Sequence, residues 1–158
     1  LISSDGKEFA VEPKVAKMSK TIASLIQDLG LEDGVSEEFL KDNAIPLAAV
    51  EEEQLAKILE WCEHYKDTVF EEEALDPDRP TRTVPEWDKQ FLQPLPDKEI
   101  FELMSATRYL GITPLYKSLC KTVAGWLTGM STAQMRTRFN IANDLTEEEE
   151  RRIRERNN

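Results

Sequence analysis

The spacing of apolar residues predicts a chain that first mixes strands with helices and then continues as helices alone. Residues 1–11 contain the dipeptide Asp5-Gly6, and because glycine tolerates positive φ, it predicts the turn of a β-hairpin. The apolar residues 45–47 predict a short strand, which Pro46 confines to an edge or an end. This order of elements predicts an α+β fold with a C-terminal helical extension.

Two helices are predicted in the first half of the chain. Ser19 or Thr21 can cap the first helix, and Gly30 ends it. The second spans residues 51–65 and follows the i, i+3, i+4, i+7 pattern of an amphipathic helix. Residues 31–43 are acidic and lack this periodicity, so we expect a loop there. The apolar faces consist of Ile22, Leu25, Ile26 and Leu29 in the first helix and Leu55, Ile58, Leu59 and Cys62 in the second.

Two further helices are predicted after residue 96. Asp97 can cap one helix, which Gly111 ends. Thr113 can cap the next, with Pro114 at its first helical position, and Gly129 ends it. Their apolar positions are Ile100, Phe101, Met104 and Leu110 in one and Leu115, Leu119, Val123 and Leu127 in the other.

Two capping boxes predict the last two helices. Ser131 with Gln134 opens a short helix, and Thr146 with Glu149 opens the final one. The final helix has acidic residues at its start and arginines towards its end, which matches the helix dipole. It has only Ile153 to bury, so its own contribution to a core is small. Its i,i+4 pairs are Glu147/Arg151, Glu148/Arg152 and Glu150/Arg154.

An acidic loop that contains proline covers residues 68–86 and is expected to be mobile. It separates the N-terminal residues 1–67 from the helices of residues 87–128. Residues 129–158 then form the C-terminal helical extension. We therefore expect one domain with an appended helical segment, which fits a chain of 158 residues.

The chain carries 31 acidic and 20 basic residues, a formal net charge of −11. Such a charge repels phosphate backbones and anionic surfaces, so neither nucleic acid nor a membrane is an expected partner. No apolar run reaches the roughly 20 residues that span a bilayer, and residues 1–4 lack the charged region and long apolar core of a secretory signal. We expect a soluble protein of the cytoplasm and nucleus. Cys62 and Cys120 are expected to be reduced thiols, although their even number leaves a disulfide open.

Few residues could support catalysis, since His64 is the only histidine. On a helix, Cys62 and His64 point about 200° apart, so they cannot share a zinc ion. No phosphate-binding or nucleophile motif occurs, and Asp76-Pro77-Asp78 lacks the spacing of a calcium loop. We therefore assign no catalytic residue, metal ligand or cofactor and do not expect an enzyme. The abundance of carboxylates leaves a small carboxylate-based hydrolase as the alternative.

Phe139 and Ile141 are apolar residues that no helical face explains. They follow a short helix and lie in a stretch without periodicity. One interpretation is a plug that seals the domain's own helices. The other is a docking surface, on which an amphipathic partner helix lays its apolar face.

Several motifs occur in the order and spacing of one protein family. They are Trp61-Cys62, Pro85-Glu86-Trp87-Asp88, Tyr109-Leu110, Cys120-Lys121-Thr122-Val123-Ala124 and the stretch from Phe139 to Glu150. With these motifs, the chain closely resembles the Skp family from about residue 3 to about residue 154. Members of this family are small adaptors that join F-box proteins to a cullin scaffold in SCF ubiquitin ligases.

The resemblance implies a BTB/POZ fold, a small sheet with flanking helices, followed by extra C-terminal helices. It implies that F-box proteins and the N-terminal region of a cullin are the partners. Without an F-box partner, an exposed apolar groove can cause self-association. The residues to which we assign F-box binding are Phe101, Leu115, Leu119, Cys120, Val123, Phe139, Ile141 and Asn143. For Phe101, Leu115 and Leu119, the residue pattern leaves a core role open.

The resemblance implies that cullin binding involves the segment around Tyr109, with Arg108 where the family usually has Asn. Arg is longer and charged, so cullin affinity or choice can differ. A half-buried core role is the alternative for Tyr109, and Trp61 and Trp87 are expected to pack in the core. Family members commonly continue into an aromatic tail that also contacts the F-box protein, whereas the sequence given ends at Asn158, so either the tail is trimmed or that contact is absent. An elongin-C-like BTB adaptor is the alternative family, which the helices after Gly129 disfavour.

Overall fold

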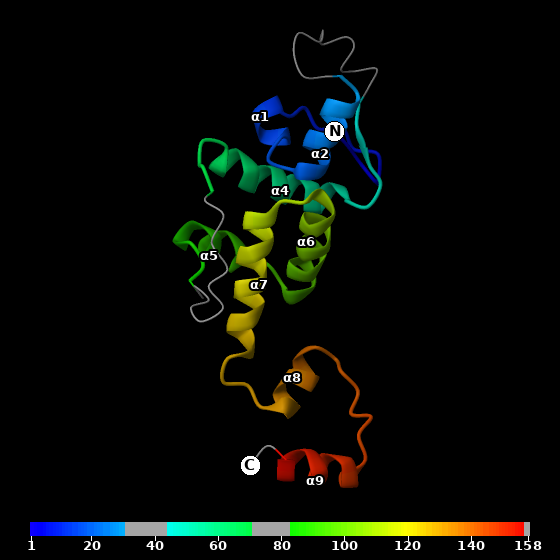
Figure 1. The fold of residues 1–158 in the computed structure, drawn as a ribbon, viewed down its shortest axis with the longest axis vertical. Helices are drawn as coiled ribbons and strands as arrows, with labels where there is room; N and C mark the ends of the chain where they lie inside the picture. The colour runs from blue at the N-terminus through cyan, green and yellow to red at the C-terminus, as the bar shows by residue number, and fades with distance from the viewer. Residues whose placement is uncertain (31–43, 71–82, 157–158) are drawn as a thin grey trace. The chain divides into compact units, whose positions relative to one another are not determined.

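The computed structural model describes residues 1–30, 44–70 and 83–156. The chain divides into two compact units, Leu1–Thr122 and Val123–Asn158. Figure 1 traces the elements along the chain. The predicted loop at residues 31–43 and most of the loop predicted at residues 68–86 lie outside the described residues.

A two-stranded sheet lies near the N-terminus. Strands β1 (Ile2–Ser3) and β2 (Pro46–Leu47) pair in parallel, with their first residues opposite each other. The chain turns back after β1 at Gly6, whose φ is +88°, and forms an antiparallel bridge between Ile2 and Glu8. The predicted hairpin turn is confirmed, but its second strand is reduced to a single bridge. Strand β2 confirms the other predicted strand.

Helices α1 (Pro13–Ala16) and α2 (Lys20–Asp28) follow this turn. The Ser19 hydroxyl accepts a hydrogen bond from the N–H of Ile22 at 3.1 Å and donates one to the carbonyl of Leu110 at 2.6 Å. Of the two candidate caps, Ser19 is therefore the one that caps α2. The same hydroxyl joins this helix to a distant part of the chain.

Helix α4 (Glu52–Tyr65) confirms the amphipathic helix predicted in the first half. It starts with a capping box that was not predicted, in which the N–H of Glu51 donates to Oε1 of Gln54 at 3.1 Å. Beyond residue 82, the chain resumes with α5 (Glu86–Leu92), a short helix with acidic residues in its first turn.

Helices α6 (Asp97–Leu110) and α7 (Thr113–Leu127) were both predicted. Asp97 is the first residue of α6 and Pro96 occupies the cap position, so the predicted Asp97 cap was wrong by one residue. Gly111 ends α6 with a φ of +68°, and a Cβ there would lie only 3.1 Å from a side-chain carbon of α2. Glycine is favoured at this position by both its backbone conformation and its close contact.

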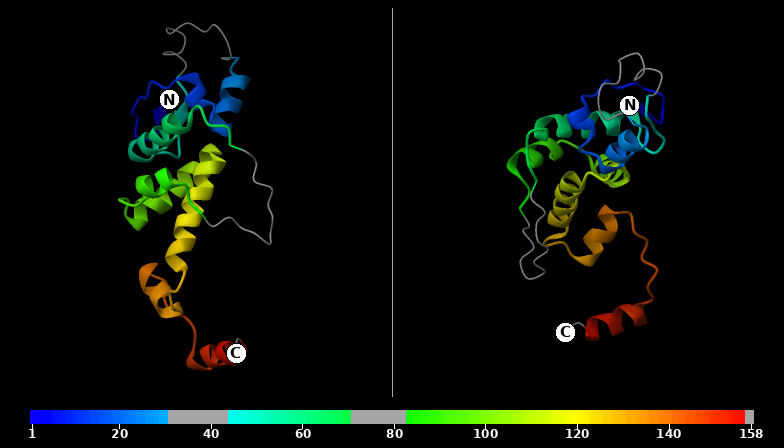
Figure 2. Two further views of the ribbon diagram at one scale, coloured as in Figure 1. Left: turned by 90° about the vertical axis from the view of Figure 1, so that its left-hand side faces the viewer. Right: turned by 45° about the horizontal axis from the view of Figure 1, so that its top comes forward.

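The core of the unit Leu1–Thr122 forms where α4 packs against α1 and α6, and where α2 packs against α6 (Figures 1 and 2). Trp61 is 1% exposed and Leu55 is 0% exposed, which confirms a core position for this tryptophan. Trp87 is half-buried. The described residues are mostly helical, with one two-stranded sheet, which supports the α+β class.

Asp88 in α5 is a carboxylate within this core, and only 1% of it is exposed. One of its oxygens accepts hydrogen bonds from Nε1–H of Trp61 at 3.0 Å and from the hydroxyl of Tyr65 at 2.9 Å. Its other oxygen accepts a hydrogen bond from the hydroxyl of Ser118. Burial, and after it the hydrogen bond to Asp88, raises the pKa of Tyr65. The carboxylate therefore ties α5 to both α4 and α7.

The second unit contains α8 (Thr132–Arg138) and α9 (Glu147–Arg156), joined by an extended segment (Figure 2). The capping box predicted for α8 is confirmed. The N–H of Ser131 donates to Oε1 of Gln134 at 2.8 Å, and the N–H of Gln134 donates back to the Ser131 hydroxyl at 3.3 Å.

Candidate docking surface

The unit that begins at Val123 has no core, since none of its described side chains is buried. Ile141 is 56% exposed and Ile153 is 47% exposed. Val123 and Phe139 are half-buried. Exposed apolar surface is stabilised when another surface covers it, so this unit is suited to binding a partner.

A Schellman turn ends α8 and shapes residues 139–141. The N–H of Ile141 donates to the carbonyl of Arg136 at 2.9 Å, and the N–H of Asn140 donates to the carbonyl of Thr137 at 3.4 Å. Asn140 has a φ of 51°, the left-handed conformation that this motif requires and that Asn tolerates better than most residues. The turn was not predicted, although Asn directly after a helix is a signal for it.

An open hollow of about 410 Å³ lies beside this turn. Ala133 and Ile141 give it apolar surface, while Arg136 and Asn143 give it polar groups. Two predicted docking residues, Ile141 and Asn143, thus line one hollow together with residues of α8 that were not predicted. The full lining is Ala133, Arg136, Thr137, Asn140, Ile141 and Asn143.

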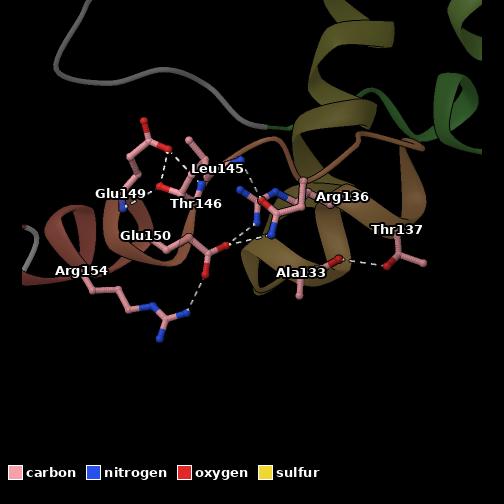
Figure 3. A network of polar contacts seen from close by, with 9 residues as sticks. Ala133, Arg136, Thr137, Leu145, Thr146, Glu149, Glu150 and Arg154 are labelled. Atoms are coloured by element: carbon pink, nitrogen blue, oxygen red, sulfur yellow. Dashed lines mark hydrogen bonds and ion pairs between the residues drawn. The ribbon is translucent and has the colours of Figure 1, made fainter.

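Glu150, in α9, joins three segments of the unit, as Figure 3 shows. Its Oε1 accepts hydrogen bonds from Nη1 of Arg136 at 3.2 Å and from the side-chain amide of Asn143 at 3.0 Å. Its Oε2 accepts one from Nη2 of Arg154 at 3.1 Å. The hydrogen bond from Asn143, followed by that from Arg136, lowers the pKa of Glu150. We call these four residues the Glu150 clasp; the sequence pattern did not predict it.

Helix α9 begins with the predicted capping box. The N–H of Thr146 donates to Oε2 of Glu149 at 2.9 Å, and the N–H of Glu149 donates to the Thr146 hydroxyl at 3.3 Å. The backbone hydrogen bond from Thr146 lowers the pKa of Glu149. The predicted i,i+4 pair of Glu148 with Arg152 is present at 2.7 Å, in addition to the pair within the clasp.

Four of the predicted F-box residues belong to the unit Leu1–Thr122. Leu115 and Leu119 are each 0% exposed, because they lie on the face of α7 that is turned into the core. Their burial favours the core role that the residue pattern left open for them. Phe101 is 39% exposed and Cys120 is half-buried, so both side chains are reached by solvent.

Arg108 and Tyr109, the predicted cullin contacts, are both exposed near the end of α6. Tyr109 is 43% exposed, which argues against the alternative of a core tyrosine. The Thr21 hydroxyl donates a hydrogen bond to the Tyr109 carbonyl at 2.8 Å and ties α2 to the backbone at this corner.

The described residues contain no group of three or more His, Cys, Asp or Glu side chains that could hold a metal ion. None of their helices is both long and apolar enough to cross a membrane. His64 stacks on Trp87, with ring centroids 3.8 Å apart, so it has a packing role. Cys62 and Cys120 are free thiols, as predicted, and burial raises the pKa of Cys62 to about 12. Residues 76–78 lie outside the described part of the chain.

A unit with a full core, followed by a unit that has no buried side chain among its described residues and exposes apolar ones, is typical of a protein that binds other proteins. Comparison with protein families supports this class. The model described as "Skp1 family, tetramerisation domain" matches residues 1–67, and that described as "Skp1 family, dimerisation domain" matches residues 113–158.

Relatives match over nearly the whole chain. Suppressor of kinetochore protein 1 of Schizosaccharomyces pombe is 39% identical over 160 residues, 99% of this chain and 93% of that protein. The E3 ubiquitin ligase complex SCF subunits sconC of Arthroderma otae and Arthroderma benhamiae are each 39% identical over 159 residues. These matches cover 99% of this chain and 90% and 91% of those two proteins. The chain therefore belongs to the Skp1 family, which confirms the resemblance.

Proposed function

We propose that this protein is a non-catalytic adaptor of an SCF E3 ubiquitin ligase, which bridges a cullin scaffold to F-box substrate receptors. Two of its relatives are named SCF subunits of an E3 ubiquitin ligase complex. The observation that carries the proposal is the unit from Val123 onward, whose described residues include exposed apolar side chains and no buried ones. An adaptor of this kind raises the effective concentration of a bound substrate near a ubiquitin-charged enzyme.

In this proposal, the unit Leu1–Thr122 has a BTB/POZ fold and binds the cullin N-terminal region. The family match of residues 1–67 and the small sheet with flanking helices support the fold. The cullin contact includes Arg108 and Tyr109, which are supported by their exposure. An exposed tyrosine ring combines apolar area with a hydroxyl, the properties of an interface anchor.

Each unit, taken by itself, has solvent-accessible apolar side chains to which we assign F-box binding. Phe101 and Cys120 come from the first unit, and Val123, Phe139 and Ile141 come from the second. Each is exposed or half-buried in the chain by itself. Left uncovered, this apolar surface promotes self-association. Function in the cytoplasm and nucleus stays a prediction. The family match of residues 113–158 gives no support to an elongin-C-like adaptor.

Calorimetric titration with an isolated F-box segment tests the adaptor role. The wild-type chain should bind with a sub-micromolar Kd. The double variant Phe139→Ala/Ile141→Ala should bind at least about 100-fold more weakly, since it loses two apolar anchors. Leu29→Ala is the matched control, because Leu29 is 54% exposed and directly follows α2 in the other unit.

The affinities of the wild type, the double variant and Leu29→Ala show which part of the proposal fails, if one does. Equal affinity of the wild type and the double variant would move the F-box site away from residues 139–141. An equal loss in Leu29→Ala would mean that any exposed apolar residue matters, and the docking surface would not be specific. An absence of binding in the wild type would contradict the adaptor role itself.

A further inference from the structure

We infer that Glu150 is a positioning residue, which holds segment 139–143 in the conformation that an F-box helix recognises. This inference rests on the proposed adaptor function and concerns how the docking surface is kept in shape. It assigns Asn143 to the same task, since the amide of Asn143 bonds to Glu150 at 3.0 Å. The F-box helix then contacts the apolar side chains of the segment, while the Glu150 clasp holds the backbone of the segment in place.

The unit from Val123 onward needs such a device because it has no buried side chain among its described residues. Helices α8 and α9 are joined by residues 139–146, which contain no regular secondary structure. In a domain with a core, apolar packing would fix a segment of this kind. Here the polar bonds of Glu150 connect α8, the segment and α9 (Figure 3).

The pair of Arg136 and Glu150 is more sheltered than ten other ion pairs within the described part of the chain. The two side chains are 23% and 26% exposed. In each of the other ion pairs between described residues, at least one side chain is more than one third exposed. Water and salt screen a sheltered pair less than an exposed one, so this pair can hold two segments together.

The clasp holds the docking segment at both ends. At the first end, Arg136 acts twice, because its carbonyl accepts the N–H of Ile141 at 2.9 Å and its guanidinium bonds to Glu150 at 3.2 Å. At the second end, Oδ1 of Asn143 accepts the N–H of Leu145 at 3.4 Å while its amide bonds to Glu150. Ile141 lies between these two anchors in the sequence, so release of Glu150 frees the backbone that carries it.

Glu148 offers a matched control two residues before Glu150. Both lie in α9, and both pair with an arginine four residues later, Glu148 with Arg152 at 2.7 Å and Glu150 with Arg154 at 3.1 Å. Replacement of either by Ala removes one charge near the start of the same helix and one i,i+4 pair. Only the replacement of Glu150 also removes the bonds to Arg136 and Asn143.

The experiment is calorimetric titration of an F-box segment into the full chain and three variants. Glu150→Ala should bind about tenfold more weakly than the wild type, and Glu148→Ala should stay within about twofold of it. Glu150→Gln should recover most of the lost affinity, because its amide oxygen can still accept from Arg136 and Asn143. Helical content by circular dichroism should be equal in the two Ala variants.

The outcomes distinguish the clasp from the adaptor role. If the wild type does not bind the segment, the proposed function fails. If the wild type binds and Glu150→Ala equals Glu148→Ala, the adaptor role stands and the clasp is overturned. A loss in Glu150→Ala that Glu150→Gln does not recover would overturn positioning through hydrogen bonds. A loss that tracks lower helical content would assign Glu150 to helix stability instead.

Discussion

In the unit Leu1–Thr122, large apolar side chains such as Trp61 and Leu119 are covered by other helices of the same chain. In the unit from Val123 onward, no described side chain is buried, and Ile141 and Ile153 are each about half exposed. Both units nevertheless contain well-capped helices. The difference lies in tertiary packing, which supplies most helical stability in proteins.

Apolar residues with the same helical spacing can either fill a core or stay accessible to solvent, and α7 contains both kinds. Leu115 and Leu119 on α7 are fully buried, while Val123 and Leu127 continue the same stripe and are only half-buried. The apolar residues of α7 are therefore buried before Val123, the first residue of the second unit, and only half-buried from there on. In the first unit, burial stabilises the fold, whereas in the second the apolar side chains stay accessible, and under the proposed function a partner covers them.

The largest expected effect on the first unit is that of Asp88→Ala. The change leaves the buried donors of Trp61 and Ser118 and the half-buried hydroxyl of Tyr65 without their acceptor, so we expect a loss of about 4 kcal/mol in the free energy of unfolding. Urea denaturation measures it. Glu86→Ala in the same helix is the control and should have little effect, since Glu86 is exposed. Similar stability in both variants would refute a supporting role for Asp88.

The contrast between the two units predicts that Leu119→Ala lowers the stability of the fold, whereas Ile141→Ala lowers the affinity for an F-box segment. Leu119→Ala opens a cavity in the core and should lower the free energy of unfolding by about 3 kcal/mol. Ile141→Ala changes an exposed residue and should stay within about 0.5 kcal/mol of the wild type, while it weakens F-box binding. Equal losses of stability in the two variants would show that the second unit has a core after all.

Alkaline pH should destabilise the first unit through Cys62. Burial raises the pKa of its thiol to about 12 in the folded chain, above the ordinary value of 9.0. The stabilisation is complete below pH 9 and is lost as the pH rises towards 12, because the unfolded thiol ionises first. Between pH 9 and pH 12, the loss in the free energy of unfolding should approach about 1.4 kcal/mol per pH unit.

Urea denaturation between pH 8 and pH 10 checks this slope. Cys62→Ala is less stable overall because it leaves a cavity, but its stability should lack this part of the pH dependence. An unchanged slope in the variant would show that the thiol is not responsible.

The smallest expected effect concerns the turn at Asn140. Asn140→Gly should retain F-box affinity, because glycine adopts the left-handed conformation easily. Asn140→Val should weaken binding by about fivefold, since a β-branched residue in this conformation costs about 1 kcal/mol. Calorimetric titration compares them. Equal affinity in the Val variant would show that the Schellman turn does not shape the docking segment.

Most helices could be predicted from the sequence because their signals are local. The apolar spacing of α4, the Gly111 stop and the two predicted capping boxes depend on residues within a few positions of one another. Helix α1 was missed because its four residues are too few to show periodicity. The Asp88 network was missed because it joins residues 23 to 30 positions apart, which no local pattern records.

The docking site could be predicted only in part. Phe139 and Ile141 stood out because no periodicity accounted for them. The sequence left the roles of Leu115 and Leu119 open between core and docking surface, because a helical stripe does not show where a core ends, and the structure buries both. The Glu150 clasp escaped notice because its carboxylate belongs to an acidic run, in which helix capping already explains the charges.

Amide hydrogen exchange of the full chain, with and without an F-box segment, tests the central contrast most directly. Without the segment, amides in α4 and α6 should exchange slowly, and those after Val123 should exchange much faster because no buried side chains protect them. With the segment, exchange in α8, α9 and residues 139–143 should slow by at least about tenfold. If the unit after Val123 is already as protected as α4, or if the segment slows exchange only before it, the account is contradicted.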